Sequence, residues 1–169
     1  MKIEKLDDDN YIVFLNKLYI GNNKLELKND FEEYFKSLFK VLNNYYGIDI
    51  IGYYNIQIFC DNLYGYIIEI KKEDLEFYEY YQNHVDMKII INDKQKFMYK
   101  VSNTSVVCPG VLKYCYLRKL NNDIYLIPKK TITQVQLGYL VENSDIVYGS
   151  KALDLLNRTE NIKTKQIFV

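Results

Sequence analysis

The chain has 169 residues, 49% of them hydrophobic and 26% charged, which suits one ordinary domain or two very small ones. Its 22 basic and 22 acidic side chains give a formal net charge of zero, so the overall positive charge typical of nucleic-acid binders is missing. The chain has eighteen tyrosines but only one histidine, and this scarcity of histidine disfavours acid–base catalysis near neutral pH.

Residues 1–15 predict a β-hairpin, because apolar residues alternate with other residues on both sides of the polar run Asp7–Asn10. The three aspartates of that run also raise the question of a hard-cation site. The spacing of a calcium-binding loop is missing, however, so we expect a polar turn. A loop around Gly21, Asn22 and Asn23 is expected to follow.

Residues 30–46 predict an amphipathic helix. Five apolar residues recur at helical spacing, namely Phe31, Phe35, Leu38, Leu42 and Tyr45. Asn29 and Glu32 fit a capping box at its start, and Gly47 fits its C-terminal stop.

Residues 54–60 and 66–70 predict a second hairpin around the turn 61–65. Each of its strands has an apolar face, and we expect one face of this sheet to lie on the helix. The elements up to this point form a self-consistent ββαββ unit over residues 1–72, with the best boundary at Lys71–Asp74.

The second half, residues 73–169, predicts a hairpin-rich α+β unit that is either separate from the first or continuous with it. Its first expected elements are a short acidic helix 73–83 and a hairpin 87–91/97–101 around Asn92–Lys94, followed by a chain break at Cys108–Gly110. A hairpin 112–119/124–127, ended by Pro128, and an ambiguous segment 131–143 come next. The last expected elements are a short strand 146–148, a helix capped by Ser150 and reaching Asn157, and a strand at 167–169. The predicted fold class is therefore α+β, with antiparallel β-hairpins packed on one long amphipathic helix (30–46) and shorter helices in the C-terminal half.

The densest aromatic cluster comprises Phe77, Tyr78, Tyr80 and Tyr81. On a short helix these side chains cannot all point inward, so we expect some exposed aromatic surface. Exposed aromatic side chains mark protein interfaces, and we therefore predict that these four residues bind a protein partner or a second copy of the chain. A second core face is the alternative interpretation.

Tyrosines interleaved with lysines suggest an alternative function, in which a nucleic-acid-associated factor stacks bases on its sheet. The residues that fit are Lys113, Tyr114 and Tyr116, with Tyr99 and Lys100. Tyrosine is also a good strand former that tolerates half-burial, so a structural role competes with this hypothesis.

A thiol enzyme is the third hypothesis. The chain has three cysteines, Cys60, Cys108 and Cys115, and the odd number without a CxxC motif disfavours a disulfide framework or a zinc site. Cys108 or Cys115 would act as nucleophile with His84 as base, and Asp86 would orient the histidine.

The remaining expectations concern location, cofactors and origin. Reduced cysteines and an N-terminus without an apolar signal core predict a cytoplasmic protein, and no segment approaches the roughly 18 apolar residues of a membrane span. The missing glycine-rich phosphate loops predict no cofactor. Lysine, asparagine, isoleucine and tyrosine all have AT-rich codons, so the composition is typical of an AT-rich genome such as that of a low-GC bacterium.

The first half of the chain contains, in this order, MKIEKLDDDNYIVFL, EEYFKSLFKVL and IIGYYNIQIFCDNLYGYIIEI. In order and polarity these segments resemble the N-terminal domain of MecA-type adaptors. Further on, CYLRKLNNDIYLI and LVENSDIVYGSKALDLL are similar to the end of the C-terminal domain of that family. The long acidic linker between the two domains of the family is missing here.

The resemblance implies an adaptor that brings substrates to a Clp-family unfoldase and regulates competence in low-GC bacteria. It transfers no functional residue to this chain. Together with the residues above, it predicts a non-enzymatic protein-binding or regulatory module.

Overall fold

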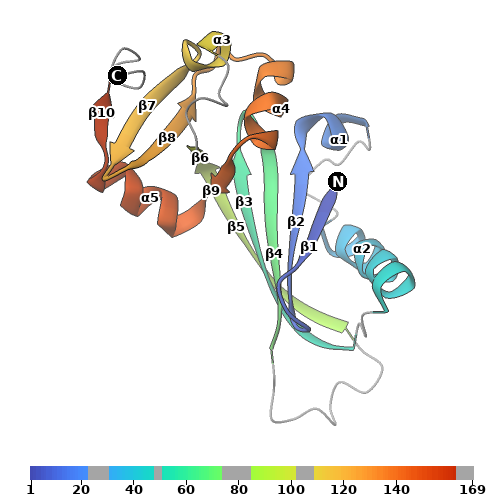
Figure 1. The fold of residues 1–169 in the computed structure, drawn as a ribbon. Coiled ribbons are helices and arrows are strands. Elements are labelled where there is room, and N and C mark those ends of the chain that lie inside the picture. Colours follow the sequence, from blue (N-terminus) through green and yellow to red (C-terminus); the bar gives the residue numbers. More distant parts are fainter. Residues whose placement is uncertain (23–30, 48–50, 74–84, 102–108, 163–169) are drawn as a thin grey trace. The chain divides into compact units, whose positions relative to one another are not determined.

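The computed structural model describes residues 1–22, 31–47, 51–73, 85–101 and 109–162 (Figure 1). Two five-stranded sheets and the helices beside them confirm the predicted α+β class. The chain divides into two units, of which the first comprises Met1–Cys60 with Gly65–Asn92 and the second Asp61–Tyr64 with Asp93–Val169. Because the strand after residue 84 joins the first sheet, the first unit extends beyond the predicted 1–72.

The sheet of the first unit has the strand order β1-β2-β4-β3-β5. The bounds are β1 Lys2–Lys5, β2 Asn10–Asn16, β3 Gly52–Asp61, β4 Gly65–Glu73 and β5 Val85–Gln95. β2 pairs antiparallel with both β1 and β4, so Ile12 lies between Glu4 and Glu69. β4 is also hydrogen-bonded to β3, so the hairpins predicted for residues 1–15 and 54–70 are both confirmed.

Helix α2, Phe31–Tyr46, covers one face of this sheet, and a shorter helix, α1, spans Lys17–Asn22. The buried residues that α2 shares with the strands are Phe35, Leu38, Phe39 and Leu42 on the helix, and Tyr11, Val13, Leu15, Tyr54, Ile56, Ile58, Ile68 and Ile70 on the sheet. Gly47 ends the helix as predicted, with a φ of 64° and its N–H donating to the Asn43 carbonyl at 2.9 Å.

The sheet of the second unit has the strand order β10-β7-β8-β6-β9. Its strands are β6 Met98–Val101, β7 Cys115–Leu120, β8 Asp123–Pro128, β9 Asp145–Val147 and β10 Glu160–Ile162, and its helices are α3 Pro109–Leu112, α4 Gln134–Glu142 and α5 Gly149–Arg158. Within this unit the strands pack on α5, since Ala152 and Leu155 lie against Met98, Tyr125 and Val147.

One predicted hairpin is wrong. The segments 87–91 and 97–101 lie in different sheets, as β5 and β6, and β6 pairs with β8 and β9. Asn92, Asp93 and Lys94 belong to β5 and form no turn. Alternation along a segment predicts a strand, but it carries no information on which strand becomes its partner.

Two local predictions also need correction, and one ambiguous segment is resolved. The expected loop at Gly21 is the end of α1, and Ser150 lies inside α5, whose N-cap is Tyr148. The ambiguous segment 131–143 is mostly helix. Thr133 and Gln136 form a capping box at its start, with bonds of 3.3 Å and 2.9 Å between side chains and backbone.

The capping box at Asn29, the acidic helix 73–83 beyond Glu73 and the strand 167–169 fall outside the described residues. Within the described ranges, no helix is long and apolar enough to cross a membrane.

Candidate functional site

The four aromatic residues predicted to bind a partner, Phe77, Tyr78, Tyr80 and Tyr81, lie outside the described residues. Their role stays a prediction. The described surface offers another aromatic group, on the second unit.

Tyr116 is the one aromatic side chain among the large hydrophobic side chains that are exposed in the described part of the chain, and 59% of its surface is accessible. It stands on β7 between two buried neighbours, Cys115 and Leu117, so strand alternation directs its ring away from them. The β7–β8 hairpin, turned at Asn121 with a φ of 55°, holds Tyr116 opposite Ile127.

Two lysines accompany Tyr116 and its neighbour Tyr114. The Lys129 ammonium lies 5.2 Å from the centroid of the Tyr116 ring, and the Lys113 ammonium lies 5.0 Å from that of Tyr114. Both distances are in the range of cation–π attraction. We call these four residues the Tyr–Lys cluster.

The backbone fixes the Tyr–Lys cluster. The Lys129 N–H donates to the Tyr114 carbonyl at 2.8 Å, and the Lys129 side chain donates to the Lys113 carbonyl at 2.9 Å. The Tyr114 N–H donates in turn to Val111 of α3 at 2.9 Å. These bonds join the two chain segments that carry the cluster at the end of the β7–β8 hairpin.

The cluster carries an uncompensated positive charge. In residues 109–162 and the other described ranges, neither Lys113 nor Lys129 has a carboxylate within ion-pair distance. The two ammonium groups, one over the exposed Tyr116 ring and one over the half-buried Tyr114 ring, therefore present a surface suited to an anionic partner.

The structure divides the set of tyrosines and lysines that the sequence suggested for base stacking. Tyr99 is only 1% exposed, and its burial raises its pKa well above the usual value, so it is not available to a ligand. Lys100 forms an ion pair of 2.8 Å with Asp123. Lys113, Tyr114 and Tyr116 remain, all in the Tyr–Lys cluster.

Lys129 is the member of the cluster that sequence reasoning missed. It stands far from Tyr116 in the chain and joins it because β8 runs back along β7, with Pro128 opposite Cys115. The predicted hairpin already indicated that Lys129 lies near Tyr116, since its turn at Asn121–Asp123 brings the start of the first strand beside the end of the second.

Cys115 does not have the properties of a catalytic thiol. It is 4% exposed, and burial raises its pKa to about 11, although Lys129 acts in the opposite direction. The thiol is therefore protonated and inaccessible near neutral pH. His84 and Cys108 lie outside the described residues, so a pair made by these two stays a prediction.

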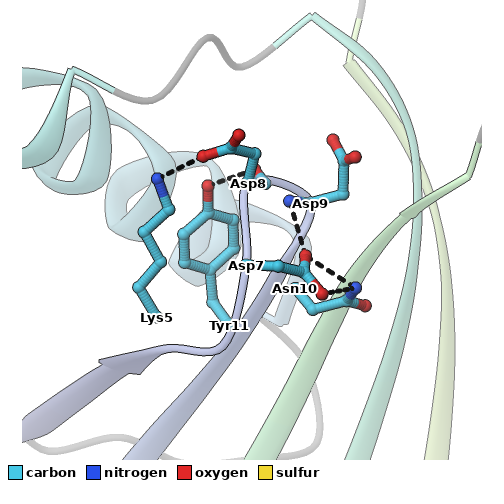
Figure 2. Close-up of polar contacts among 6 residues, drawn as sticks. All are labelled: Lys5, Asp7, Asp8, Asp9, Asn10 and Tyr11. Carbon is cyan, nitrogen blue, oxygen red and sulfur yellow. Dashed lines mark hydrogen bonds and ion pairs between the residues drawn. The ribbon is translucent and has the colours of Figure 1, made fainter.

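The aspartate run of the first hairpin forms a polar turn, as expected (Figure 2). Asn10 donates to both carboxylate oxygens of Asp7 at 2.8 Å, and these bonds lower the pKa of Asp7. Lys5 pairs with Asp8 at 2.7 Å, while the Tyr11 hydroxyl donates to the Asp8 carbonyl. Among the described residues, no cluster of three His, Cys, Asp or Glu side chains is suited to a metal ion.

The first unit has a depression of about 210 Å³, which is smaller than the roughly 300–1,000 Å³ of typical ligand pockets. Its polar lining consists of Asn10, Asn55, Gln57, Glu69 and Lys71. The small volume makes it a weaker candidate than the Tyr–Lys cluster.

No protein-family model, curated protein or solved structure matches the chain.

Proposed function

We propose that the protein is a non-enzymatic protein-binding or regulatory module, adaptor-like in its action, and that the Tyr–Lys cluster contacts its partner. The observation that carries this proposal is the exposed Tyr116 ring with the Lys129 ammonium over it, next to the second pair formed by Lys113 and Tyr114. Neither lysine forms an ion pair with a described residue. Tyrosine supplies a large, rigid contact area with a polar tip, which explains its enrichment at binding hot spots. The charge favours an acidic segment of the partner.

The sequence resemblance to MecA-type adaptors supports the same class of function, in which the bound protein is delivered to an unfoldase. Phe77, Tyr78, Tyr80 and Tyr81 would then supply a second aromatic contact.

The experiment is a pull-down from a lysate of the native host with the wild type, Tyr116→Ser and Lys129→Glu. We expect each variant to retain about a tenth or less of the captured partner, the loss typical of a hot-spot side chain. Leu153→Ser is the matched control, because Leu153 is 55% exposed in the same unit and lies outside the Tyr–Lys cluster. Undiminished capture by both cluster variants would refute the proposal.

A nucleic-acid-associated factor is the second candidate, favoured by the same tyrosines and lysines. Binding of a single-stranded oligonucleotide, followed by fluorescence anisotropy over a salt series, separates the two. Two lysine–phosphate contacts predict that the logarithm of the binding constant falls with a slope of about −1.4 against the logarithm of salt concentration. Absent or salt-independent binding removes this candidate.

A further inference from the structure

Strand β5 is an edge of the first sheet. In the described part of the first unit it pairs with β3, and no described strand lies on its other side (Figure 1). An edge strand presents a row of backbone N–H and C=O groups that can pair with another chain. Natural proteins usually protect such edges with short length, proline or charge. β5 spans 11 residues and contains no proline.

The centre of β5 is apolar. Val85, Met87 and Ile89 are partly buried against the core beneath α2. Ile91, the next residue of that alternation, is 47% exposed. With Ile90 between them, three consecutive isoleucines occupy the middle of the edge. The middle of β5 therefore has no charged side chain of the kind that discourages an edge strand from pairing with another chain.

We propose that β5 pairs antiparallel with β5 of a second copy of the chain, about a twofold axis at Ile90. This axis places Ile89 of each copy opposite Ile91 of the other, so that each exposed Ile91 gains an apolar cross-strand neighbour. The contact is isologous and joins the first sheet of one copy to the first sheet of the other, edge to edge.

Two of the four charged residues of β5 are complementary under the same axis, which sets the other two, Lys88 and Asp93, opposite Asn92 and Met87. In the sequence, Asp86 and Lys94 stand four positions before and after Ile90, so the axis sets each aspartate opposite the lysine of the other copy. Opposite charges at directly opposed positions stabilise strand pairs, and like charges destabilise them.

Neighbouring registers are less complementary. An axis at Lys88 would place that lysine opposite itself, and an axis at Ile91 would place Lys88 opposite Lys94. An axis at Ile89 would place Lys88 opposite Ile90 and form no pair of opposite charges. The axis at Ile90 alone pairs the whole length of β5 while opposing Asp86 to Lys94.

Sedimentation equilibrium of the full chain over a concentration series tests the proposal. The wild type should form a reversible dimer, and Ile91→Lys should raise its dissociation constant by at least about tenfold, because the new charge faces an isoleucine. Folding should survive, since Ile91 is already half exposed. Val135→Lys is the matched control, at an 84% exposed position of the second unit, and should dimerise like the wild type.

A charge exchange tests the identity of the partner strand. Asp86→Lys alone and Lys94→Asp alone should each weaken the dimer by creating like-charge pairs across the axis. The double variant should restore it, because the exchange regenerates both opposite-charge pairs. If β5 bound a chain other than a second copy, the double variant would not restore the binding.

A monomeric wild type would overturn the proposal, as would a dimer indifferent to Ile91→Lys or a double variant without rescue. If the protein is monomeric and Ile91→Lys instead reduces capture of host proteins, β5 binds a different chain and the second-copy proposal fails. The Tyr–Lys cluster is not part of this interface, so these outcomes leave the proposed function to its own test.

Discussion

At the scale of single residues, the role of each tyrosine depends on the strand face it occupies. Tyr54 and Tyr99 are each 1% exposed and fill the cores of their units, whereas Tyr116 stands outside on β7. All three are the same residue type in strands with alternating patterns. The abundance of tyrosine therefore indicates neither a core nor an interface until the inward face of each strand is known.

The Tyr99 hydroxyl provides a test of this dependence, because it is buried without a hydrogen-bond partner in the described structure. Tyr99→Phe removes a desolvated polar group, so the free energy of unfolding should stay constant or rise by up to about 1 kcal/mol. Tyr11→Phe is the matched control. Its hydroxyl donates to the Asp8 carbonyl, and the variant should lose about 1 kcal/mol in urea unfolding followed by circular dichroism.

Tyr99→Phe should also change how the free energy of unfolding responds to alkaline pH. Burial raises the pKa of Tyr99 above its ordinary value of 10.0, so the unfolded chain loses this proton first as pH rises. The stability contribution is complete below pH 10.0 and declines above it. Tyr99→Phe should make this decline shallower. An unchanged decline would show that the pKa of Tyr99 is not raised in the folded protein, and a clear loss of stability at neutral pH would show that the hydroxyl has a partner.

At the scale of elements, local patterns predict a helix or strand well when its ends are marked by residues close in the chain. Helix α2 matches its prediction because the apolar spacing and Gly47 both lie within it or beside it. Helix α4 was ambiguous because Thr133 and Gly138 reduce helix propensity. Thr133 instead stabilises that helix as its N-cap, a role that depends on its position rather than on its propensity.

Two glycines should respond oppositely to alanine. Gly65, at the start of β4, has a φ of 126°, and an added Cβ would overlap the carbonyl oxygen of Leu15 on the neighbouring strand. Gly65→Ala should therefore lower the free energy of unfolding by about 2–4 kcal/mol, as expected for backbone strain combined with a backbone clash.

Gly138 is the control for that substitution. It lies in α4 with no atom within 4 Å of an added Cβ, so Gly138→Ala should stabilise the protein by up to about 1 kcal/mol. Both values are measurable by denaturant unfolding. Equal effects at the two positions would contradict the geometry of the strand start.

At the scale of the whole molecule, the turn of one hairpin belongs to the second unit. The strands β3 and β4 lie in the first sheet, but Asp61–Tyr64 joins the second unit. The Asp61 carboxylate accepts the Phe97 N–H at 3.3 Å, and the rings of Tyr64 and Phe97 are 5.8 Å apart. The second unit is therefore assembled from two separate stretches of the chain.

A fragment of residues 93–169 should for this reason be less stable than the same residues in the full chain. It lacks the Tyr64 ring, so Phe97, which is 1% exposed, loses a neighbour that helps to bury it. Thermal unfolding followed by circular dichroism, with amide spectra by NMR, measures the difference. Identical melting and native-like spectra of the fragment would show that residues 61–64 are dispensable.

By itself the sequence determined the α+β class, the long helix and three of the four predicted hairpins, and it named three of the four residues of the Tyr–Lys cluster as candidates for base stacking. These features depend on periodicity and on turn residues that act within one or two neighbouring elements. Tertiary structure decided that β5 joins β3 rather than β6, that the Lys129 ammonium lies over the Tyr116 ring, and that Asp61–Tyr64 belongs to the second unit. The physical reason is that strand partners are chosen by long-range burial and backbone pairing, which alternation along a single segment does not encode.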